Sequence, residues 1–236
     1  MLNTEDIRKI FIEKYKKGDF RTIGNEVQQS RTVEIQNAHF EVDKFWIVRR
    51  PNYDYFEKEK EWYLGQSLNV HDIPGDTPKM WLACADKDGF INSNYGWCIF
   101  SEENKNQYRN CLRQLIDDPY TRRAVMIYTR PEMQYEYNKN GMSDFMCTCY
   151  THQFVRNKKL VYIVYQRSCD AIFGFRNDLA WHQYVANRLI KDLRDNNIDV
   201  DFYPEIIFSC GSIHIYERHF KFIEQYIHKD DPEINA

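Results

Sequence analysis

The sequence lacks a surplus of positive charge. Its 32 Lys and Arg residues are balanced by 35 Asp and Glu residues, which gives a formal net charge of −3. Non-specific binding to nucleic acid needs a clear basic excess, because the protein must neutralise several phosphates. We therefore do not expect nucleic acid as a partner, although two or three arginines could still hold a small anionic ligand.

Long apolar runs are also missing. No stretch approaches the 18 apolar residues that indicate a membrane-spanning helix. The first twenty residues are charged and amphipathic, and they lack the apolar centre of a signal peptide. We expect a soluble, cytoplasmic protein without a membrane partner.

The seven cysteines form no CxxC pair and no Cys–His cluster with the spacing of a metal site. Their odd number and irregular spacing argue against a disulfide framework. Neither GxGxxG nor GxxxxGK[ST] occurs, so dinucleotide and P-loop sites have no support. We expect no metal, and the open question is whether one cysteine is a nucleophile.

Aromatic residues, by contrast, are abundant, at 16% of the 236 residues. Such a chain can bury a sizeable core and is not disordered. No repeat, low-complexity run or Pro/Gly/Ser-rich linker divides it. We therefore predict a single domain over residues 1–236.

The hydrophobic pattern mixes helices and strands in irregular order, which is typical of an α+β fold. Thr4 is a plausible N-cap for the first helix, Gly65 is a plausible stop for the second, and residues 71–78 and 92–97 are expected to be a loop and a turn. The predicted helices are 4–17, 53–64, 104–116 and 179–195. The predicted strands are 32–42, 124–129, 144–155, 160–165 and 205–210.

Four segments are unusually polar for the apolar runs around them. Adjacent arginines are more often a solvated face, and a strand cysteine or a His-x-Tyr pair is more often structural than functional. The segment Gln166–Asp170 is harder to explain in this way, because burying its Arg and its Asp is costly unless they pair or meet a ligand. The segments are Thr121–Arg123, Asp144–Cys149, Gln166–Asp170 and Gly211–His219.

Together these segments resemble the thymidylate synthase family, over most of the chain from about Glu59 to His219. Within that family the likeness is greatest to the branch that hydroxymethylates deoxycytidylate. The strings that carry it are DIPGDTPKMW, INSNYGW, IYTRPEMQ, YNKNGMSDFMCT and FGFRND. The resemblance implies a mixed β-sheet covered by helices, with the sheets of two chains packed back to back in a homodimer. If the gene is carried by a phage, the protein would act in the host cytoplasm.

The resemblance also implies catalytic roles. The Cys147 thiolate would attack carbon 6 of a pyrimidine nucleotide, which makes carbon 5 nucleophilic. Glu59 would order the water and proton network, Tyr95 would assist the proton transfer at carbon 5, and Asp178 would read the base. The guanidinium of Arg167 would lie beside Cys147 and lower the pKa of its thiol.

The same resemblance implies which residues bind the two substrates. Arg122 and Arg123 would reach the phosphate site of the partner chain, and 5,10-methylenetetrahydrofolate would be the cosubstrate. The nucleotide would be bound by Arg122, Arg123, Arg167, Ser168, Asp170, Asp178, His214 and Tyr216. The folate would be bound by Trp81, Asp170 and Gly174.

One part of the family pattern does not carry over. The family has a phosphate-binding Arg or Lys in an N-terminal loop, whereas residues 24–31 (GNEVQQSR) have no basic residue at the aligned position. Arg21 or Arg31 could substitute, and the sequence does not choose between them.

Two departures separate this chain from a methylating synthase. The family's Pro-Cys-His is Met146-Cys147-Thr148 here, and its base-reading Asn is Asp178. An amide suits uracil, which offers both an acceptor and a donor, whereas a carboxylate accepts the N4 amino hydrogen of cytosine and can stabilise a proton on N3. Asp178 therefore favours a cytosine nucleotide.

The sequence thus predicts that a one-carbon unit passes from the folate to carbon 5 of dCMP and that water adds, giving 5-hydroxymethyl-dCMP and tetrahydrofolate. The alternative is a CMP 5-hydroxymethylase, because packing around carbon 2′ cannot be read from spacing. A dUMP methylase or hydroxymethylase is disfavoured by Asp178. A non-catalytic binding protein is disfavoured by the retained thiol and arginines.

Overall fold

The computed structural model describes residues 1–24 and 29–228 of the chain. The helices are α1 (Thr4–Lys16), α2 (Tyr53–Gly65), α3 (Lys79–Cys84), α4 (Tyr95–Phe100), α5 (Gln107–Asp117), α6 (Met133–Glu136), α7 (Gly174–Asp195) and α8 (Phe220–His228), with 3₁₀ turns at Val70–Asp72, Lys139–Gly141 and Glu217–His219. The strands are β1 (Leu2–Asn3), β2 (Arg21–Gly24), β3 (Gln29–Glu41), β4 (Val125–Ile127), β5 (Thr148–Arg156), β6 (Lys159–Gln166), β7 (Cys169–Asp170) and β8 (Glu205–Tyr216).

Within these ranges the strands form a mixed sheet in the order β1-β3-β8-β6-β5-β4, with β2 paired to β3 and β7 to β8. The neighbours β3 and β8 are antiparallel, whereas β6 and β8 are parallel. Parallel neighbours need a crossover, and here α7 provides it between β6 and β8. The predicted α+β fold with a mixed sheet is confirmed.

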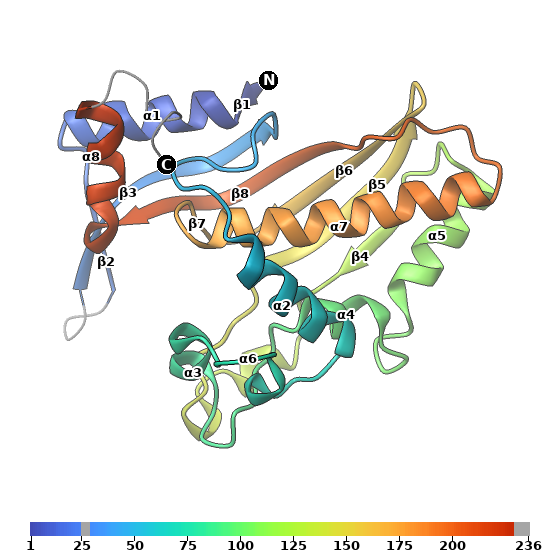
Figure 1. Cartoon of the computed structure of the whole chain (residues 1–236), viewed down its shortest axis with the longest axis horizontal. Coiled ribbons are helices and arrows are strands. Elements are labelled where there is room, and N and C mark those ends of the chain that lie inside the picture. Colours follow the sequence, from blue (N-terminus) through green and yellow to red (C-terminus); the bar gives the residue numbers. More distant parts are fainter. Residues whose placement is uncertain (25–28, 229–236) are drawn as a thin grey trace.

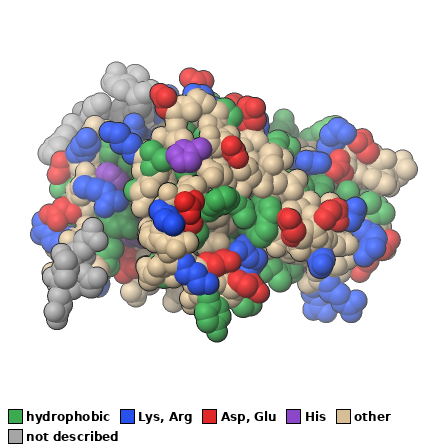
Figure 2. Space-filling view, turned by 90° about the horizontal axis from the view of Figure 1, so that it is seen from below, with side chains coloured by type: hydrophobic (Ala, Val, Ile, Leu, Met, Phe, Trp, Pro, Cys, Tyr) green, Lys and Arg blue, Asp and Glu red, His purple; other side chains and the backbone are tan. Residues whose placement is uncertain are grey.

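The helices cover the sheet unevenly. Figure 1 shows α7 and α5 lying across one face, α1 and α8 beside the β2–β3 end, and α2, α3, α4 and α6 gathered below. Seen from that lower side, apolar side chains are exposed near the middle of the surface, with charged side chains around them and toward both ends (Figure 2). Among the exposed apolar residues of the chain are Met80 and Leu82 of α3.

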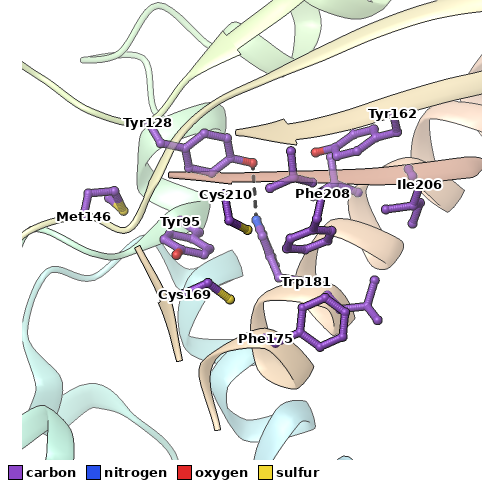
Figure 3. Close-up of a cluster of buried hydrophobic side chains, with 14 of the residues drawn as sticks. Tyr95, Tyr128, Met146, Tyr162, Cys169, Phe175, Trp181, Ile206, Phe208 and Cys210 are labelled. Carbon is purple, nitrogen blue, oxygen red and sulfur yellow. Dashed lines mark hydrogen bonds between the residues drawn. The ribbon is translucent and has the colours of Figure 1, made fainter. Parts of the chain in front are cut away.

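The core lies between α7 and the sheet. Phe175 and Trp181 of α7 are completely buried: the ring of Phe175 meets that of Phe208 of β8 edge to face at 5.0 Å, and the Trp181 indole N–H donates to the Tyr128 hydroxyl at 3.4 Å (Figure 3). Burying an aromatic side chain of this size contributes about 2–3 kcal/mol. This apolar layer fixes α7 on the sheet and so determines what its first turns face.

Most of the predicted elements are confirmed, with boundaries that shift by a few residues. The helices predicted at 4–17, 53–64 and 104–116 correspond to α1, α2 and α5, and the strands predicted at 32–42 and 160–165 correspond to β3 and β6. The strand predicted at 124–129 is shorter, and the helix predicted at 179–195 already begins at Gly174. The strand predicted at 205–210 continues to Tyr216.

Three local predictions are wrong. The N-cap of α1 is Asn3 and not Thr4, because Asn3 and Asp6 form a reciprocal capping box. Gly65 does not stop α2; it is the last helical residue, and Gln66 follows with φ of 58°. Residues 92–97 are only partly a turn, since Asn94 caps α4, which begins at Tyr95.

The fourth error bears on the site. Asp144–Cys147 was predicted inside a strand, yet β5 begins only at Thr148. The reason is the Asp144 carboxylate, which accepts hydrogen bonds from the backbone N–H groups of Asn92 and Ser93 at 2.7 and 2.8 Å. These bonds hold the segment against the turn before α4, so it does not pair with a strand.

Across residues 1–24 and 29–228, no helix combines the length and the apolar character that crossing a membrane requires. The single domain over residues 1–236 stays a prediction, as does the homodimer.

Candidate active site

The polar segments meet where β6 ends and α7 begins. Gln166 is the last residue of β6, and the chain then passes through β7, where Asp170 is in register with His214 of β8. Gly174 opens α7 four residues later. Because β6 and β8 are parallel and α7 crosses between them, the carboxyl end of β6 and the first turn of α7 lie at the same edge of the sheet.

Cys147 lies in the loop that Asp144 anchors, directly before β5. The Arg167 backbone N–H donates to the Cys147 carbonyl at 3.0 Å, and the Arg167 side chain donates to the carbonyls of Met146 (3.0 Å) and Phe145 (2.7 Å). These bonds fix the loop on the end of β6. The Cys147 thiol is half-buried at the centre of the cluster.

The prediction that Arg167 lies beside Cys147 is confirmed, with one guanidinium nitrogen 4.0 Å from Sγ. The expected net effect on the pKa is wrong. Burial raises the pKa of the Cys147 thiol to about 12, and the negative charge of Asp178 adds to this increase. The Arg167 charge lowers the pKa, but not enough to offset burial, so the thiol of the free protein is protonated at neutral pH.

Asp178 is the centre of a buried hydrogen-bond network. Its Oδ1 accepts from the Tyr95 hydroxyl at 3.1 Å, and its Oδ2 accepts from Gln166 Nε2 at 2.7 Å. Thr148 Oγ1 donates to Tyr95 at 3.2 Å and accepts from Gln166 at 3.2 Å. Burial raises the pKa of Asp178 to about 6, while the two donated bonds limit the increase.

Glu59 forms a second buried group with two aromatic residues. Its Oε1 accepts from the Tyr55 hydroxyl at 2.5 Å and from Trp81 Nε1 at 3.2 Å. Burial raises the pKa of Glu59 to about 7, and the charge of Asp178 contributes to the increase. Trp81 therefore lies beside Glu59, and its role in folate binding stays a prediction. Its indole also binds the Tyr55 hydroxyl at 3.0 Å.

Two glycines lie next to this site, and one of them allows a close approach. A Cβ on Gly96 would lie 1.8 Å from the Tyr63 carbonyl, so only glycine lets α4 pack against α2, where the Tyr95 ring stacks on that of Tyr63 at 5.3 Å. A Cβ on Gly174 would lie 3.4 Å from the Asp170 Cβ and 4.0 Å from the Asp178 Oδ2. Gly174 thus borders the space between the two carboxylates.

Asp170 is held by the first turn before α7. Its Oδ1 accepts from the backbone N–H groups of Ile172 at 2.8 Å and Phe173 at 3.4 Å. Among the hydrogen bonds of the described residues, none uses Oδ2. The fixed carboxylate can therefore present one oxygen to the donor groups of a ligand.

The predicted sugar-binding pair lies on β8. His214 is buried and its ring meets the Tyr216 ring edge to face at 4.7 Å. Burial lowers the pKa of His214, so the ring is neutral at pH 7, while the charge of Asp170 opposes this effect. Ser168 is half-buried between Arg167 and β7.

Arg122 and Arg123 are not brought to this cluster within the chain. Both side chains are exposed just before β4, the edge strand at the far side of the sheet from β3. Of the N-terminal candidates, Arg21 pairs with Asp19 at 2.8 Å, and Arg31 binds Glu217. The backbones of both candidates lie close to Tyr216 of the predicted site. Thr32 pairs with Tyr216, and Thr32 is in register with Arg21 and next to Arg31 in the sequence. Residues 25–28 of the stretch 24–31 lie outside the described residues.

Four residues that complete the network were not predicted from the sequence to have a role: Tyr55, Thr148, Gln166 and His182. Tyr55 lies four residues before Glu59 on one helix, a spacing that could have indicated the contact. His182 lies four residues after Asp178 on α7, and its Nε2 is 3.3 Å from Thr148 Oγ1. The Thr148 contact spans 34 residues of sequence, so no local pattern indicates it.

A hollow of about 410 Å³ lies elsewhere, at the opposite end of β8, and is lined by Glu41, Lys159 and residues 201–205. It contains none of the predicted site residues, so its size does not make it the reactive centre. In the part of the chain that the structure describes, no group of three His, Cys, Asp or Glu side chains could hold a metal ion.

The chain is similar to known proteins over most of its length. The family model described as Thymidylate synthase matches residues 4–235. The chain is 47% identical to the deoxycytidylate 5-hydroxymethyltransferases of Enterobacteria phages T4 and T2, over 83% of this chain and 80% of each relative. It is 24% identical to the thymidylate synthase of Francisella tularensis subsp. holarctica, over 72% of this chain and 63% of that protein.

Proposed function

This chain belongs to the thymidylate synthase family, and we propose that it is a hydroxymethyltransferase that converts dCMP to 5-hydroxymethyl-dCMP. Enzymes of this family use methylenetetrahydrofolate as cosubstrate. The proposal follows the two phage relatives, whose names give deoxycytidylate as the substrate.

The observation that carries the proposal is the half-buried Asp178 carboxylate, whose charge acts on the Cys147 thiol. Tyr95 and Gln166 each use one acceptor position of Asp178, which leaves others for the N4 amino group of cytosine. With a pKa of about 6, Asp178 can also share a proton with N3 of the ring. Uracil would set its O4 acceptor against the carboxylate, and this unpaired arrangement is costly in a closed site.

Cys147 acts as the nucleophile that adds to carbon 6. Its thiol must lose a proton first, and Asp178 is one reason why its pKa is high. A hydrogen bond from the N4 amino group of cytosine disperses part of the charge of Asp178, so this repulsion falls and the nearby Arg167 guanidinium favours the thiolate. Substrate binding and activation of the nucleophile are thereby linked, so the free enzyme does not carry a reactive thiolate.

Glu59 and Tyr95 handle protons around carbon 5. Glu59 has a pKa of about 7, so it can give or take a proton near neutral pH, and Tyr55 and Trp81 keep it in place. Tyr95 holds a hydroxyl between Thr148 and Asp178. In this assignment Glu59 orders the water that completes the hydroxymethyl group, and Tyr95 assists removal of the carbon-5 proton.

The folate fits the residues between α2, α3 and the start of α7. Trp81 offers an aromatic ring, Asp170 offers a fixed carboxylate oxygen, and Gly174 leaves open the space that a Cβ would fill. When bound there, the cosubstrate supplies the one-carbon unit that carbon 5 takes up. His214 and Tyr216 would hold the sugar, and Arg167 and Ser168 the phosphate.

We further propose that the enzyme is a homodimer in which Arg122 and Arg123 serve the partner's phosphate site. Support comes from the sheet face opposite α7, where Ile127 pairs with Tyr150 and Tyr150 stacks on Tyr165 at 4.3 Å. Ile127 and Tyr150 are exposed in the single chain. Mixing inactive Arg123→Ala with inactive Cys147→Ser chains should restore activity, and no recovery in demonstrated hybrids would count against shared sites.

The test of the function is product identification by mass spectrometry, with methylenetetrahydrofolate and dCMP, CMP or dUMP in parallel. We expect 5-hydroxymethyl-dCMP from dCMP and little product from the other two nucleotides. A dominant product from CMP or dUMP would overturn the substrate assignment. Release of tritium from carbon 5 of labelled dCMP separates an enzyme from a protein that only binds the nucleotide.

A further inference from the structure

A buried histidine lies directly behind the proposed catalytic network, and the function described above gives it no role. His182 is fully buried on α7, with Nε2 at 3.3 Å from Thr148 Oγ1 and Nδ1 at 3.4 Å from the Tyr162 hydroxyl. Its ring packs at about 6 Å from the rings of Tyr95 and Tyr128. Tyr95, Tyr128 and Tyr162 appear together in Figure 3, in the layer between α7 and the sheet.

The directions of the hydrogen bonds can be worked out from the carboxylate backward. When Asp178 is ionised it only accepts, so the Tyr95 hydroxyl must donate to it. The Tyr95 oxygen then receives its other bond from the Thr148 hydroxyl, whose single hydrogen is thereby used. Thr148 Oγ1 has only acceptor positions left, and one of them takes a hydrogen from Gln166.

The remaining neighbour of Thr148 is His182 Nε2, which must therefore carry a hydrogen. A neutral imidazole has one donor and one acceptor nitrogen, so Nδ1 accepts from the Tyr162 hydroxyl. In the opposite tautomer Nε2 would take the Thr148 hydrogen, and the single hydrogen of the Tyr95 hydroxyl could then serve either Asp178 or Thr148, so one of these two contacts would lack a hydrogen. Burial lowers the pKa of His182 to about 3, which keeps the ring neutral.

We propose that His182, as the neutral Nε2–H tautomer, is a positioning residue that orients Thr148 and through it Tyr95 and Asp178. The proposal rests on the function assigned above. The chain of donors runs from Tyr162 through His182, Thr148 and Tyr95 to Asp178. Every hydrogen in this chain points toward the carboxylate that reads cytosine.

This arrangement gives a physical account of Thr148. The resemblance places a histidine at the position after the nucleophile, and this chain has Thr148 there. In this protein the imidazole of His182, on α7, forms a hydrogen bond with the Thr148 hydroxyl. A threonine alone could rotate its hydroxyl, whereas the bond from His182 leaves one orientation.

The tautomer is tested on the wild-type protein by ¹⁵N NMR of labelled histidine at pH 8, with His182→Gln used to assign the signal among the seven histidines. We expect a neutral ring protonated at Nε2 that does not become charged down to pH 6. An Nδ1–H tautomer or a charged ring would overturn the proposal. This measurement does not depend on activity, so it decides the matter even if the enzyme is found to use another nucleotide.

The kinetic test compares His182→Phe, which keeps a ring without a donor, with His182→Gln, which keeps an N–H donor. We expect His182→Phe to lower kcat for tritium release from dCMP about tenfold, with KM changed less than about threefold, and His182→Gln to recover most of kcat. Tenfold corresponds to about 1.4 kcal/mol, near the value of one hydrogen bond.

The matched control is Tyr63→Phe. This change removes a hydroxyl that takes no part in the series of hydrogen bonds, from a ring that stacks on Tyr95 at 5.3 Å. It should leave kcat within about twofold. An unchanged kcat in His182→Phe would overturn the positioning role. So would an equal loss in both folded His182 variants, since this would indicate packing alone. Absence of tritium release from the wild-type enzyme would instead refute the proposed function.

Discussion

The two halves of α7 make opposite contributions to the protein. The first half faces the site and contains polar groups: Arg176 and His182 are buried, and Asp178 is half-buried. The second half contains apolar side chains that are fully buried, namely Val185, Ala186, Leu189 and Leu193. One helix thus holds both the groups that are costly to bury and the groups that stabilise the fold.

The difference shows how the chain tolerates an expensive site. Removing a carboxylate or a thiolate from water disfavours the charged form, as the raised pKa values of Asp178 and Cys147 indicate. Burying an apolar side chain contributes about 1.5–3 kcal/mol. Phe175, Trp181 and the apolar second half of α7 together fix the helix firmly enough that its first turns can also hold polar groups with few alternative positions.

The largest expected effect is on activity and comes from replacing the nucleophile Cys147. Cys147→Ser should lower kcat by at least about 10⁴-fold, because a hydroxyl of much higher pKa cannot replace the thiolate. The free energy of unfolding should change by less than about 1 kcal/mol. Cys149→Ala is the control and should keep kcat within about tenfold. Equal losses in the two variants would show that Cys147 has been assigned wrongly.

The apolar half should respond in the opposite way. Leu189→Ala should lower the free energy of unfolding by about 2–5 kcal/mol, because it leaves a cavity under α7. The kcat of the folded fraction should stay within about twofold. Urea unfolding followed by circular dichroism measures the change, with exposed Asn187→Ala on the same helix as control. A large loss of kcat with little loss of stability would contradict the division of α7.

Glu59 gives a prediction about pH. Its pKa rises from 4.5 in the unfolded chain to about 7 in the folded protein, so the folded state holds the proton more tightly between these values. The wild type should therefore lose stability as pH rises from about 5 to 7, and Glu59→Gln should remove roughly 3 kcal/mol of this dependence. The exposed Glu57→Gln should run parallel to the wild type, and a parallel curve for Glu59→Gln would refute the burial argument.

The smallest expected effect concerns base choice. Asp178→Asn should lower kcat/KM for dCMP and raise it for dUMP, because an amide can donate to O4 of uracil. The ratio between the two nucleotides should fall about 10- to 100-fold, which corresponds to one unpaired polar group. Assays of both proteins on both nucleotides give the ratio. If it stays at the wild-type value, Asp178 does not select cytosine.

Much of the site could be predicted from the sequence because its residues stand in long, ordered strings. The structure brings most of the predicted residues to one end of the sheet: Cys147, Arg167, Asp170, Asp178, His214 and Tyr216. Arg122 and Arg123 instead stay beside the edge strand β4. Helices and strands with strong periodicity were also predicted correctly. The pattern of side chains along the chain is local information, and a local pattern is what the sequence displays.

The errors have a common physical origin in contacts between distant segments. The Asp144–Cys147 loop resembles a strand by composition, and it is a loop because the Asp144 carboxylate takes the backbone hydrogens of Asn92 and Ser93, more than 50 residues away. The pKa of Cys147 was expected to fall beside Arg167, and it rises because burial outweighs one neighbouring charge. Neither burial nor a distant donor is visible in a local pattern.

The sequence by itself therefore determined the identity of the reactive groups: a thiol at Cys147, a carboxylate at Asp178 where an amide would suit uracil, and the arginines nearby. Only the tertiary structure decided the states of these groups. Proton affinity depends on how much water the fold excludes, and hydrogen-bond direction depends on which neighbours surround each hydroxyl. The contact of His182 with Thr148 exists because α7 lies across the sheet at this point, and that position results from the packing of the whole core.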